Sequence, residues 1–375
     1  AFIMEKKNID WQNLGFGYVK TDYRYVSDFK DGAWDEGRLT EDATIAISEC
    51  AGVFQYAQTC FEGLKAYTTA DGKIVCFRPD LNAERMIDTC ERLKMPIFPK
   101  ERFLDAVRRT VAANREWVPP YGSGASLYLR PYMFGFDSVI GVKPANEYQF
   151  RVFATPVGPY FKGGVRPLNL RISDLDRAAP RGTGNVKAGL NYAMSLYAIV
   201  DAHEKGYDEN IYVDAATRTN IEETGGANVI FIKGNTLVTP KSDSILPSIT
   251  RRSLMYVAKE YLGMEVEERE VALSEIDTFS ECGLCGTAAV ISPVGKINDH
   301  GKEIFFSNGI HFSQDRGHRV TKKGPRGSEV LPCLYIDRID LGHHALYPAV
   351  GDDVPGAKRQ PRCYVEQLGM AVEDG

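Results

Sequence analysis

A segment rich in proline and glycine, residues 159–167, lies near the middle of the chain and separates two stretches of strand-forming residues. Proline and glycine clusters of this kind interrupt regular structure and mark turns or linkers. The chain has 375 residues, whereas a single domain usually has about 100–200 residues. We therefore expect a smaller N-terminal domain over residues 1–160, a linker over 161–174 and a larger C-terminal domain over 175–375.

The spacing of apolar residues changes along the first half of the chain. Residues 64–77 place strand-forming residues on both sides of Asp71-Gly72, which predicts a β-hairpin. Further on, apolar residues recur three and four positions apart, as they do in amphipathic helices. The predicted elements are further strands at 43–50, 125–136 and 148–157, and helices at 81–94 and 101–118. Strands with helices on one side predict an α+β layer.

The second half combines strand-like runs with two helix-like stretches. The predicted strands are 168–172, 210–213 and 228–238, and the predicted helices are 189–205 and 250–262. Pro247 and Thr250 introduce the second helix, since proline and threonine are common at a helix start. After about residue 308 the periodicity fades, and no regular element is predicted there.

The charge of the chain argues against several classes of partner. With 45 basic and 50 acidic residues the formal net charge is −5, whereas nucleic-acid binders usually carry a basic excess. No run of about 18 apolar residues is present to span a membrane. Residues 1–12 carry charges where a signal peptide would be apolar. We expect a cytoplasmic protein that binds neither nucleic acid nor membrane.

The histidines and cysteines argue against a metal site. All six histidines lie at position 203 or later, so the first half cannot supply an imidazole base or ligand. The eight cysteines form no regular framework, which predicts reduced thiols. Cys282 and Cys285 have a suggestive spacing, but no second pair completes a zinc site. No metal is therefore expected.

One lysine, Lys187, stands between small residues in the segment GTGNVKAGLNY, residues 182–192, where a flat ligand could approach the backbone. The segment also fits a solvated loop lysine, and it matches neither a dinucleotide fingerprint nor a phosphate-binding loop. Residues 246–251 and 285–289 can each present backbone N–H groups to an anion. A helix cap and a small-residue turn would have the same sequences. Together with the lysine, these stretches indicate a phosphate site.

A carboxylate, Glu223, precedes a glycine pair in the segment NIEETGGAN, residues 220–228. A buried carboxylate needs a partner, and a protonated ring nitrogen would be one. The alternative is an exposed acid in a turn.

These segments resemble, in order and approximate spacing, the branched-chain aminotransferases, which are pyridoxal phosphate (PLP) enzymes of fold type IV. The resemblance runs from about Gly15 to Gly301. It rests on seven motifs, which are FEGLK at 61–65, FRPDLNAER at 77–85, LYLRP at 127–131, KAGLNY at 187–192, ETGGAN at 223–228, LPSIT at 246–250 and GTA at 286–288. The resemblance implies an α+β fold of two domains, of which the larger has a β-barrel-like core, with the active site between them.

The resemblance also implies roles for individual residues. Lys187 would carry PLP as a Schiff base and serve as the catalytic general base and acid. Glu223 would keep the ring nitrogen protonated. The cofactor would further be bound by Arg85, Tyr192, Ile249, Thr250 and Thr287, and the substrate by Tyr56, Phe61, Tyr128, Arg130, Thr287 and Ala288.

The implied activity is reversible transfer of the amino group of L-leucine, L-isoleucine or L-valine to 2-oxoglutarate by a homodimer. Glutamate must then enter an apolar pocket, and either Arg130 or backbone amides would have to accept its second carboxylate. D-amino-acid transaminases and aminodeoxychorismate lyases share the lysine and the glutamate, so they stay as alternatives. An inactive binding protein that retains the fold is a further alternative.

The chain departs from the family pattern in places. Ser248 stands where many relatives have glycine, a change that requires a negative φ at this position. Residues 320–323 (VTKK) run into GPRG, where relatives open a C-terminal helix. Residues 320–375 are therefore expected to be an atypical tail, altered beyond about Lys323.

Overall fold

The computed structural model of the chain describes residues 6–160 and 166–306, together with the backbone of residues 346–348. The described part falls into two compact units. The first contains residues 6–160, the segment Val186–Gly189 and strand 346–348, and the second contains residues 166–185 and 190–306. Residues 186–189 thus pack with the first unit, although they lie in the range expected for the second domain. That range and its linker stay predictions.

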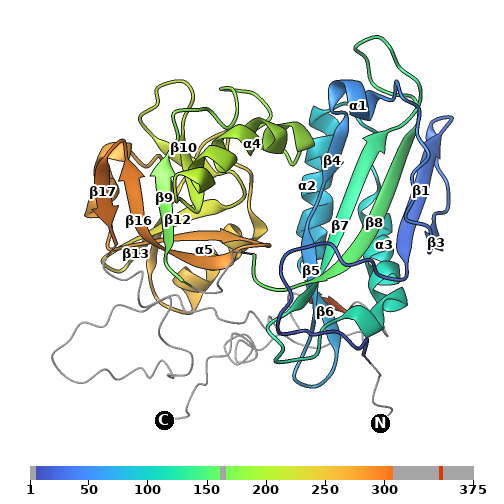
Figure 1. The fold of residues 1–375 in the computed structure, drawn as a ribbon, viewed down its shortest axis with the longest axis horizontal. Coiled ribbons are helices and arrows are strands. Elements are labelled where there is room, and N and C mark those ends of the chain that lie inside the picture. Colours follow the sequence, from blue (N-terminus) through green and yellow to red (C-terminus); the bar gives the residue numbers. More distant parts are fainter. Residues whose placement is uncertain (1–5, 161–165, 307–345, 349–375) are drawn as a thin grey trace. The chain divides into compact units, whose positions relative to one another are not determined.

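The first unit is built on an antiparallel sheet (Figure 1). Its strands follow the order β18-β6-β5-β7-β8-β1-β2, while β3 pairs with β1 and β4 pairs with β7. The strands are β1 (Arg24–Lys30), β2 (Ala33–Trp34), β3 (Arg38–Thr40), β4 (Thr59–Phe61), β5 (Leu64–Thr68), β6 (Ile74–Phe77), β7 (Ser126–Gly135), β8 (Tyr148–Val157) and β18 (Leu346–Pro348). The long β7–β8 pair runs in unbroken register from Ser126 opposite Val157 to Gly135 opposite Tyr148. It forms the centre of the sheet.

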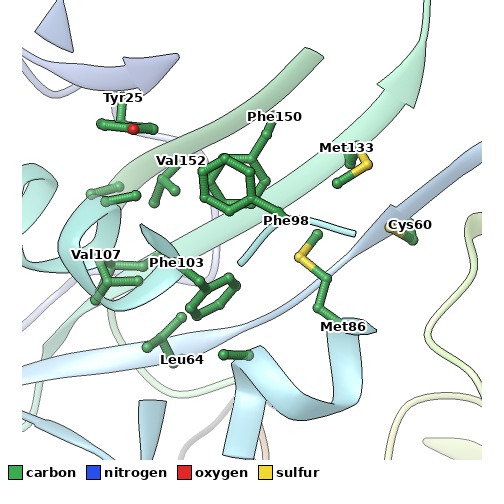
Figure 2. Packing of buried hydrophobic residues seen from close by; sticks show 14 of the residues in the cluster. Tyr25, Cys60, Leu64, Met86, Phe98, Phe103, Val107, Met133, Phe150 and Val152 are labelled. Carbon is green, nitrogen blue, oxygen red and sulfur yellow. The ribbon is translucent and has the colours of Figure 1, made fainter. Parts of the chain in front are cut away.

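Two helices cover one face of this sheet (Figure 1). The helical elements are α1 (Gly52–Tyr56), α2 (Pro79–Arg92), α3 (Lys100–Ala113) and a 3-10 turn η1 (Arg115–Trp117). Proline begins α2 and directly precedes α3, where its missing N–H costs no helical hydrogen bond. The apolar sides of both helices and of the sheet form one core, which Figure 2 shows. In it the rings of Phe98 and Phe150 stack with centroids 3.9 Å apart.

The second unit contains a closed β-barrel. Pairing of β11 with β12 closes a ring of six strands in the order β11-β10-β9-β16-β15-β12. Its elements are β9 (Leu168–Ile172), α4 (Gly189–Glu204), β10 (Glu209–Val213), β11 (Ile221–Thr224), β12 (Asn228–Lys233), β13 (Thr236–Pro240), α5 (Ile249–Glu260), β14 (Glu265–Arg269), η2 (Leu273–Thr278), β15 (Glu281–Gly286), β16 (Val290–Asp299) and β17 (Lys302–Phe305). Helix α5 packs Leu254 and Ala258 against Ile230, Ile232 and Leu237 of β12 and β13. The barrel implied by the family resemblance is confirmed, as is the α+β fold of two domains.

Most predicted elements are present, and three differ from expectation. Residues 43–50 form no strand, because their backbone bonds locally, as in Thr44 N–H to Asp42 Oδ1 at 2.8 Å. Residues 228–238 form the hairpin β12–β13 rather than one strand, with Gly234 at a φ of 59° in the turn. Helix α3 ends at Ala113, because the Asn114 side chain bonds the backbone of Tyr23. The predicted atypical tail, 320–375, lies outside the described side chains.

Replacing Phe150 by alanine should lower the free energy of unfolding of the first unit by about 3–5 kcal/mol, because it removes a buried ring and leaves a cavity. All three tryptophans, Trp11, Trp34 and Trp117, belong to this unit, so their fluorescence during guanidinium unfolding reports on it. Phe54→Ala is the control, because that ring is 59% exposed and its loss should cost little. Equal losses for the two variants would contradict the assigned core.

Candidate active site

Lys187 is held against the first unit by its own backbone. Its N–H donates to Thr89 Oγ1 of α2 at 3.1 Å, and its carbonyl accepts the Phe61 N–H of β4 at 3.1 Å. The next residue, Ala188, forms an isolated bridge with Cys60. The side chain then places Nζ 4.8 Å from the centre of the Phe61 ring. The lysine therefore has a fixed position and is not a solvated loop residue.

An aromatic and cationic surface surrounds this amine on the face of the sheet opposite the helices. Phe61 and Tyr132 are register partners, and side chains alternate along β7, so Tyr128 and Arg130 share the face of Phe61. The Arg130 guanidinium carbon lies 4.6 Å from the Phe61 ring centre, and its Nη2 donates to Tyr128 Oη at 3.1 Å. The structure thus brings Lys187, Phe61, Tyr128 and Arg130 together.

Gly63 makes this arrangement possible. A Cβ atom at Gly63 would lie 2.1 Å from Tyr128 Oη, so no other residue fits without moving the tyrosine. Tyr56, by contrast, is the last residue of α1 and is 38% exposed. Its hydroxyl donates to the Ile140 carbonyl on the loop after β7. Its predicted contact with substrate stays a prediction.

Arg85 forms a buried ion pair that the sequence did not reveal. Its Nε and Nη2 donate to the two carboxylate oxygens of Glu62 at 2.8 and 2.7 Å, and the Glu62 side chain is fully buried. Asn82 Nδ2 donates to the same carboxylate at 2.8 Å. Thr89 Oγ1 donates to the Arg85 carbonyl at 2.9 Å and also accepts the Lys187 N–H. Arg85 is therefore tied to the Lys187 backbone through one hydroxyl. Its predicted contact with a phosphate stays a prediction.

In the second unit, Glu223 is a buried carboxylate with three donors. Arg177 Nη2 lies 2.8 Å from Oε1, the Leu246 N–H donates to Oε1 at 2.8 Å, and Asn228 Nδ2 donates to Oε2 at 2.6 Å. Burial raises the pKa of Glu223, and the nearby Arg177 guanidinium opposes that rise. The alternative of an exposed turn acid is wrong, because Glu223 is 4% exposed. No motif in the sequence indicates Arg177 as the partner of Glu223.

The start of α5 offers free backbone donors close to Glu223. Ser248 caps the helix with a φ of −78°, as expected, and its Oγ accepts the Arg251 N–H at 3.1 Å. Among the described residues, no oxygen accepts the N–H groups of Ile249 and Thr250. Unpaired donors at a positive helix end favour an anion.

Three further predicted residues belong to the second unit. Thr287 and Ala288 lie in the tight turn between β15 and β16, and this turn is near Glu223 because Asn228 pairs with Cys285. Tyr192 lies in the first turn of α4, whose start is fixed by the Asn191 side chain donating to the Thr183 carbonyl at 2.7 Å. The contacts predicted for these three residues stay predictions.

Cys282 and Cys285 do not form a chelating pair. They are three residues apart on β15 and so point to opposite faces. Both are buried, and burial raises the pKa of Cys285 to about 12. Within residues 6–160 and 166–306, no three acidic, histidine or cysteine side chains cluster as metal ligands would. In the same part of the chain, no helix is both long and apolar enough to cross a bilayer.

The chemistry of these groups fits pyridoxal phosphate. An amine at Lys187 can join its aldehyde, a buried carboxylate at Glu223 can pair with a protonated pyridine, and the unpaired N–H groups of Ile249 and Thr250 can take its phosphate.

Comparison with known proteins agrees with this fit. The family model for amino-transferase class IV matches residues 59–297. A branched-chain-amino-acid aminotransferase of Haemophilus influenzae is 55% identical over 302 residues, which cover 79% of this chain and 88% of the relative.

Solved structures agree as well. The branched-chain amino acid aminotransferase of Escherichia coli has a TM-score of 0.66 at 28% identity, covering 77% of this chain and 90% of its own. The enzyme of Thermobaculum terrenum, solved in its PLP form, has a TM-score of 0.61 at 26% identity, covering 74% of this chain and 86% of its own. The chain therefore belongs to the class IV aminotransferases, enzymes whose cofactor is pyridoxal phosphate, and within them to the branched-chain-amino-acid aminotransferases.

Proposed function

We propose that the protein transfers the amino group of L-leucine, L-isoleucine or L-valine reversibly to 2-oxoglutarate, giving the branched 2-oxo acid and L-glutamate. The observation that carries the proposal is the position of the Lys187 amine over the Phe61 ring, next to the cation of Arg130. An aromatic surface with one cation suits a branched aliphatic side chain as well as a carboxylate. The names of the relatives support the same substrates.

Lys187 would move the proton in this reaction. When bound, PLP supplies an electron-withdrawing ring that stabilises negative charge at the substrate α-carbon. The Lys187 amine would take the proton from that carbon as general base and, as general acid, deliver it to the C4′ carbon of the cofactor. The hydrogen bonds of its backbone to Thr89 and Phe61 limit the volume that the amine can reach.

Glu223 would keep the pyridine nitrogen protonated. Its carboxylate is oriented by Arg177, Asn228 and the Leu246 N–H before any ligand arrives, so little reorganisation is needed. Arg177 is the positioning residue, because its charge favours the ionised form of the buried acid.

The phosphate would be bound by the N–H groups of Ile249 and Thr250 and the Thr287 hydroxyl, with Arg85 as a cation and Tyr192 on the phenolic oxygen of the ring. The first two donors are free for such a role among the described residues.

The substrate carboxylate would bind Tyr128 and the backbone at Thr287 and Ala288, with Tyr56 at the pocket edge. For glutamate, Arg130 is the better candidate for the second carboxylate. Its guanidinium has no carboxylate within 4.0 Å in the described part, and its buried Nε has no hydrogen-bond acceptor there. Backbone amides would provide no compensating charge.

The substrate assignment is tested by comparing L-leucine with 2-oxoglutarate, D-alanine with 2-oxoglutarate, and aminodeoxychorismate alone. We expect turnover with the first pair. Preference for D-alanine or aminodeoxychorismate would assign the chain to a related activity of the same fold. A colourless protein that stays unlabelled by PLP and borohydride would instead be an inactive binding protein. The cytoplasmic location stays a prediction.

Replacing Lys187 by alanine should reduce kcat by at least about 10³-fold, because it removes the amine proposed to move the α-proton. PLP should still bind through the contacts to its phosphate and ring, which absorbance after gel filtration will detect. The matched control is Lys205→Ala, since Lys205 lies on the surface and pairs with Asp201. Near-normal turnover of Lys187→Ala would remove the lysine from the mechanism.

Replacing Arg177 by methionine should raise the pKa of Glu223, because burial then acts without an opposing charge. The reaction needs the ionised carboxylate, which is lost as pH falls through its pKa. The acid limb of the kcat/KM profile should therefore move to higher pH by about one unit or more, and Arg177→Lys should partly restore it. An unchanged acid limb with a uniformly lower rate would indicate a purely structural role.

We also propose a homodimer, supported by the surface of α4. Four large apolar side chains on this helix, Met194, Leu196, Tyr197 and Val200, are 52–73% exposed, and such clusters usually mark protein interfaces. The Leu196→Glu/Val200→Glu variant should elute as a monomer in size-exclusion chromatography with light scattering. Tyr121→Glu, at an exposed loop position, is the control. A wild-type monomer, or a dimer that survives both charges, would argue against this interface.

A further inference from the structure

Three strands of the first unit gather arginines on one face of the sheet. Val26 of β1 is the register partner of both Arg38 on β3 and Arg151 on β8. Arg24, two residues before Val26, points to the same face. The residues between them, such as Tyr25, belong to the core on the other face. The sheet geometry alone therefore brings three guanidinium groups to one region.

Two of these arginines are buried and donate hydrogen bonds to neutral oxygen atoms. Arg24 is 2% exposed and donates to the carbonyl oxygens of Thr21, Asp22 and Glu41. Arg151 is 6% exposed and donates to Gln149 Oε1 at 2.8 Å and to the Asp42 carbonyl at 3.2 Å.

Within residues 6–160 and 166–306, no carboxylate oxygen lies within 4.0 Å of either guanidinium group, whereas Arg38 contacts Asp28 at 2.9 Å and Asp35 at 3.3 Å.

An unpaired buried cation is an unusual feature, because a desolvated charge is costly unless an opposite charge compensates it. Burial lowers the pKa of Arg151, and the positive charges of Arg24 and Arg38 lower it further. The Tyr132 hydroxyl and Asp42 oppose this effect only in part. Arg24 and Arg151 therefore have no carboxylate in direct contact within the described residues, and Asp42 offsets the charge of Arg151 only in part.

A cavity of about 160 Å³ lies beside this charge. Its polar lining comes from Arg38, Thr40, Asp42, Thr44, Gln149 and Arg151. The Asp42 carboxylate accepts the Thr44 N–H, which lowers the pKa of Asp42 and keeps it ionised, so the cavity lining has one negative charge beside the two arginines. A planar guanidinium, hydroxyl groups and an amide around a small volume match the oxygen atoms of a carboxylate or a phosphate. The volume suits a small ion better than a whole cofactor.

This region differs from the proposed substrate surface. On the β7–β8 pair, Arg130 is opposite Phe153 and Arg151 is opposite Tyr132. The rings of Tyr132 and Phe153 contact each other with centroids 5.9 Å apart. The cavity lies beyond Arg151, toward β1 and β3.

We propose that this cavity is a second anion site, which binds one small oxyanion, a carboxylate or a phosphate, through the guanidinium of Arg151. The ion compensates the buried charge. It also ties β8 to residues 42–46, the segment that leads to α1. An anion that binds only the folded unit stabilises that unit in proportion to its concentration.

The test is calorimetric titration of the PLP-loaded enzyme, in which the phosphate donors of the cofactor site are already occupied. Inorganic phosphate and acetate are titrated separately at constant ionic strength. We expect at least one of the two ions to bind at one site per chain that depends on Arg151, with affinity at least about tenfold weaker in Arg151→Met, whereas acetate bound at the substrate carboxylate site should be unaffected by this change. Binding of acetate alone assigns a carboxylate, and binding of phosphate alone assigns a phosphate. Arg109→Met, on α3 over the Tyr25 ring, is the matched control and should bind normally.

Three outcomes would overturn the proposal. The first is the absence of binding heat with either ion in the wild-type protein, and the second is binding that survives Arg151→Met unchanged. The third outcome is a change of oligomeric state in Arg151→Met, since a carboxylate from a second copy of the chain would then be the partner of Arg151. If the methionine variant does not fold, Arg151→Lys replaces it. That variant keeps the charge but loses the planar fork, and it should bind the ion more weakly at the same stoichiometry.

Discussion

The buried ion pair between Glu62 and Arg85 determines how the first unit is built around Lys187. Glu62 has no exposed side-chain surface, and its N–H donates to the Pro131 carbonyl at 2.7 Å, so both its backbone and its carboxylate are fixed. Cys60 of β4 belongs to the core on the helix side, so Phe61, the next residue of the strand, points to the opposite face, where the Lys187 amine lies, and Glu62 directly after it is bound to α2. Breaking a buried pair by removing one partner is strongly destabilising. The pair therefore fixes the orientation of Phe61 as well as the position of α2.

The second unit has the same kind of interaction at Glu223, a buried carboxylate bound by a guanidinium group. On β11, Glu222 and Glu223 point to opposite faces; Glu222 accepts a hydrogen bond from Ser242 at 2.6 Å, while Glu223 is bound by Arg177. Burial raises the pKa of both acids, but only Glu223 has a guanidinium in direct contact. An adjacent cation is what allows a carboxylate to remain charged away from water. The two acids are adjacent in sequence, but only the surroundings of Glu223 favour the ionised carboxylate by direct contact with a guanidinium group.

The sequence predicts the helices and strands better than it predicts which side chains contact the site residues. Strands β8 and β9 have the predicted ends, because their apolar runs are bounded by clear breaks. The order of motifs identified Lys187 and Glu223, although neither position is distinctive by itself. Arg177 was missed because its contact with Glu223 depends on the path of the barrel, which local spacing does not encode. Glu62 could have been recognised from the sequence, because the residues two positions before and after it, Cys60 and Leu64, are apolar core residues, and an acid between them needs a cation nearby.

The distribution of charge on the first unit connects these findings. The face that carries Phe61 also carries Arg130 and Arg151, and in the described part neither guanidinium has a carboxylate partner. The acidic residue Glu62 is directed to the other face, where Arg85 neutralises it. The whole chain has a net charge of −5, so its average field repels anions. Every substrate and product of the proposed reaction carries a carboxylate, and a local excess of unpaired cations on this face is what would draw such molecules to it.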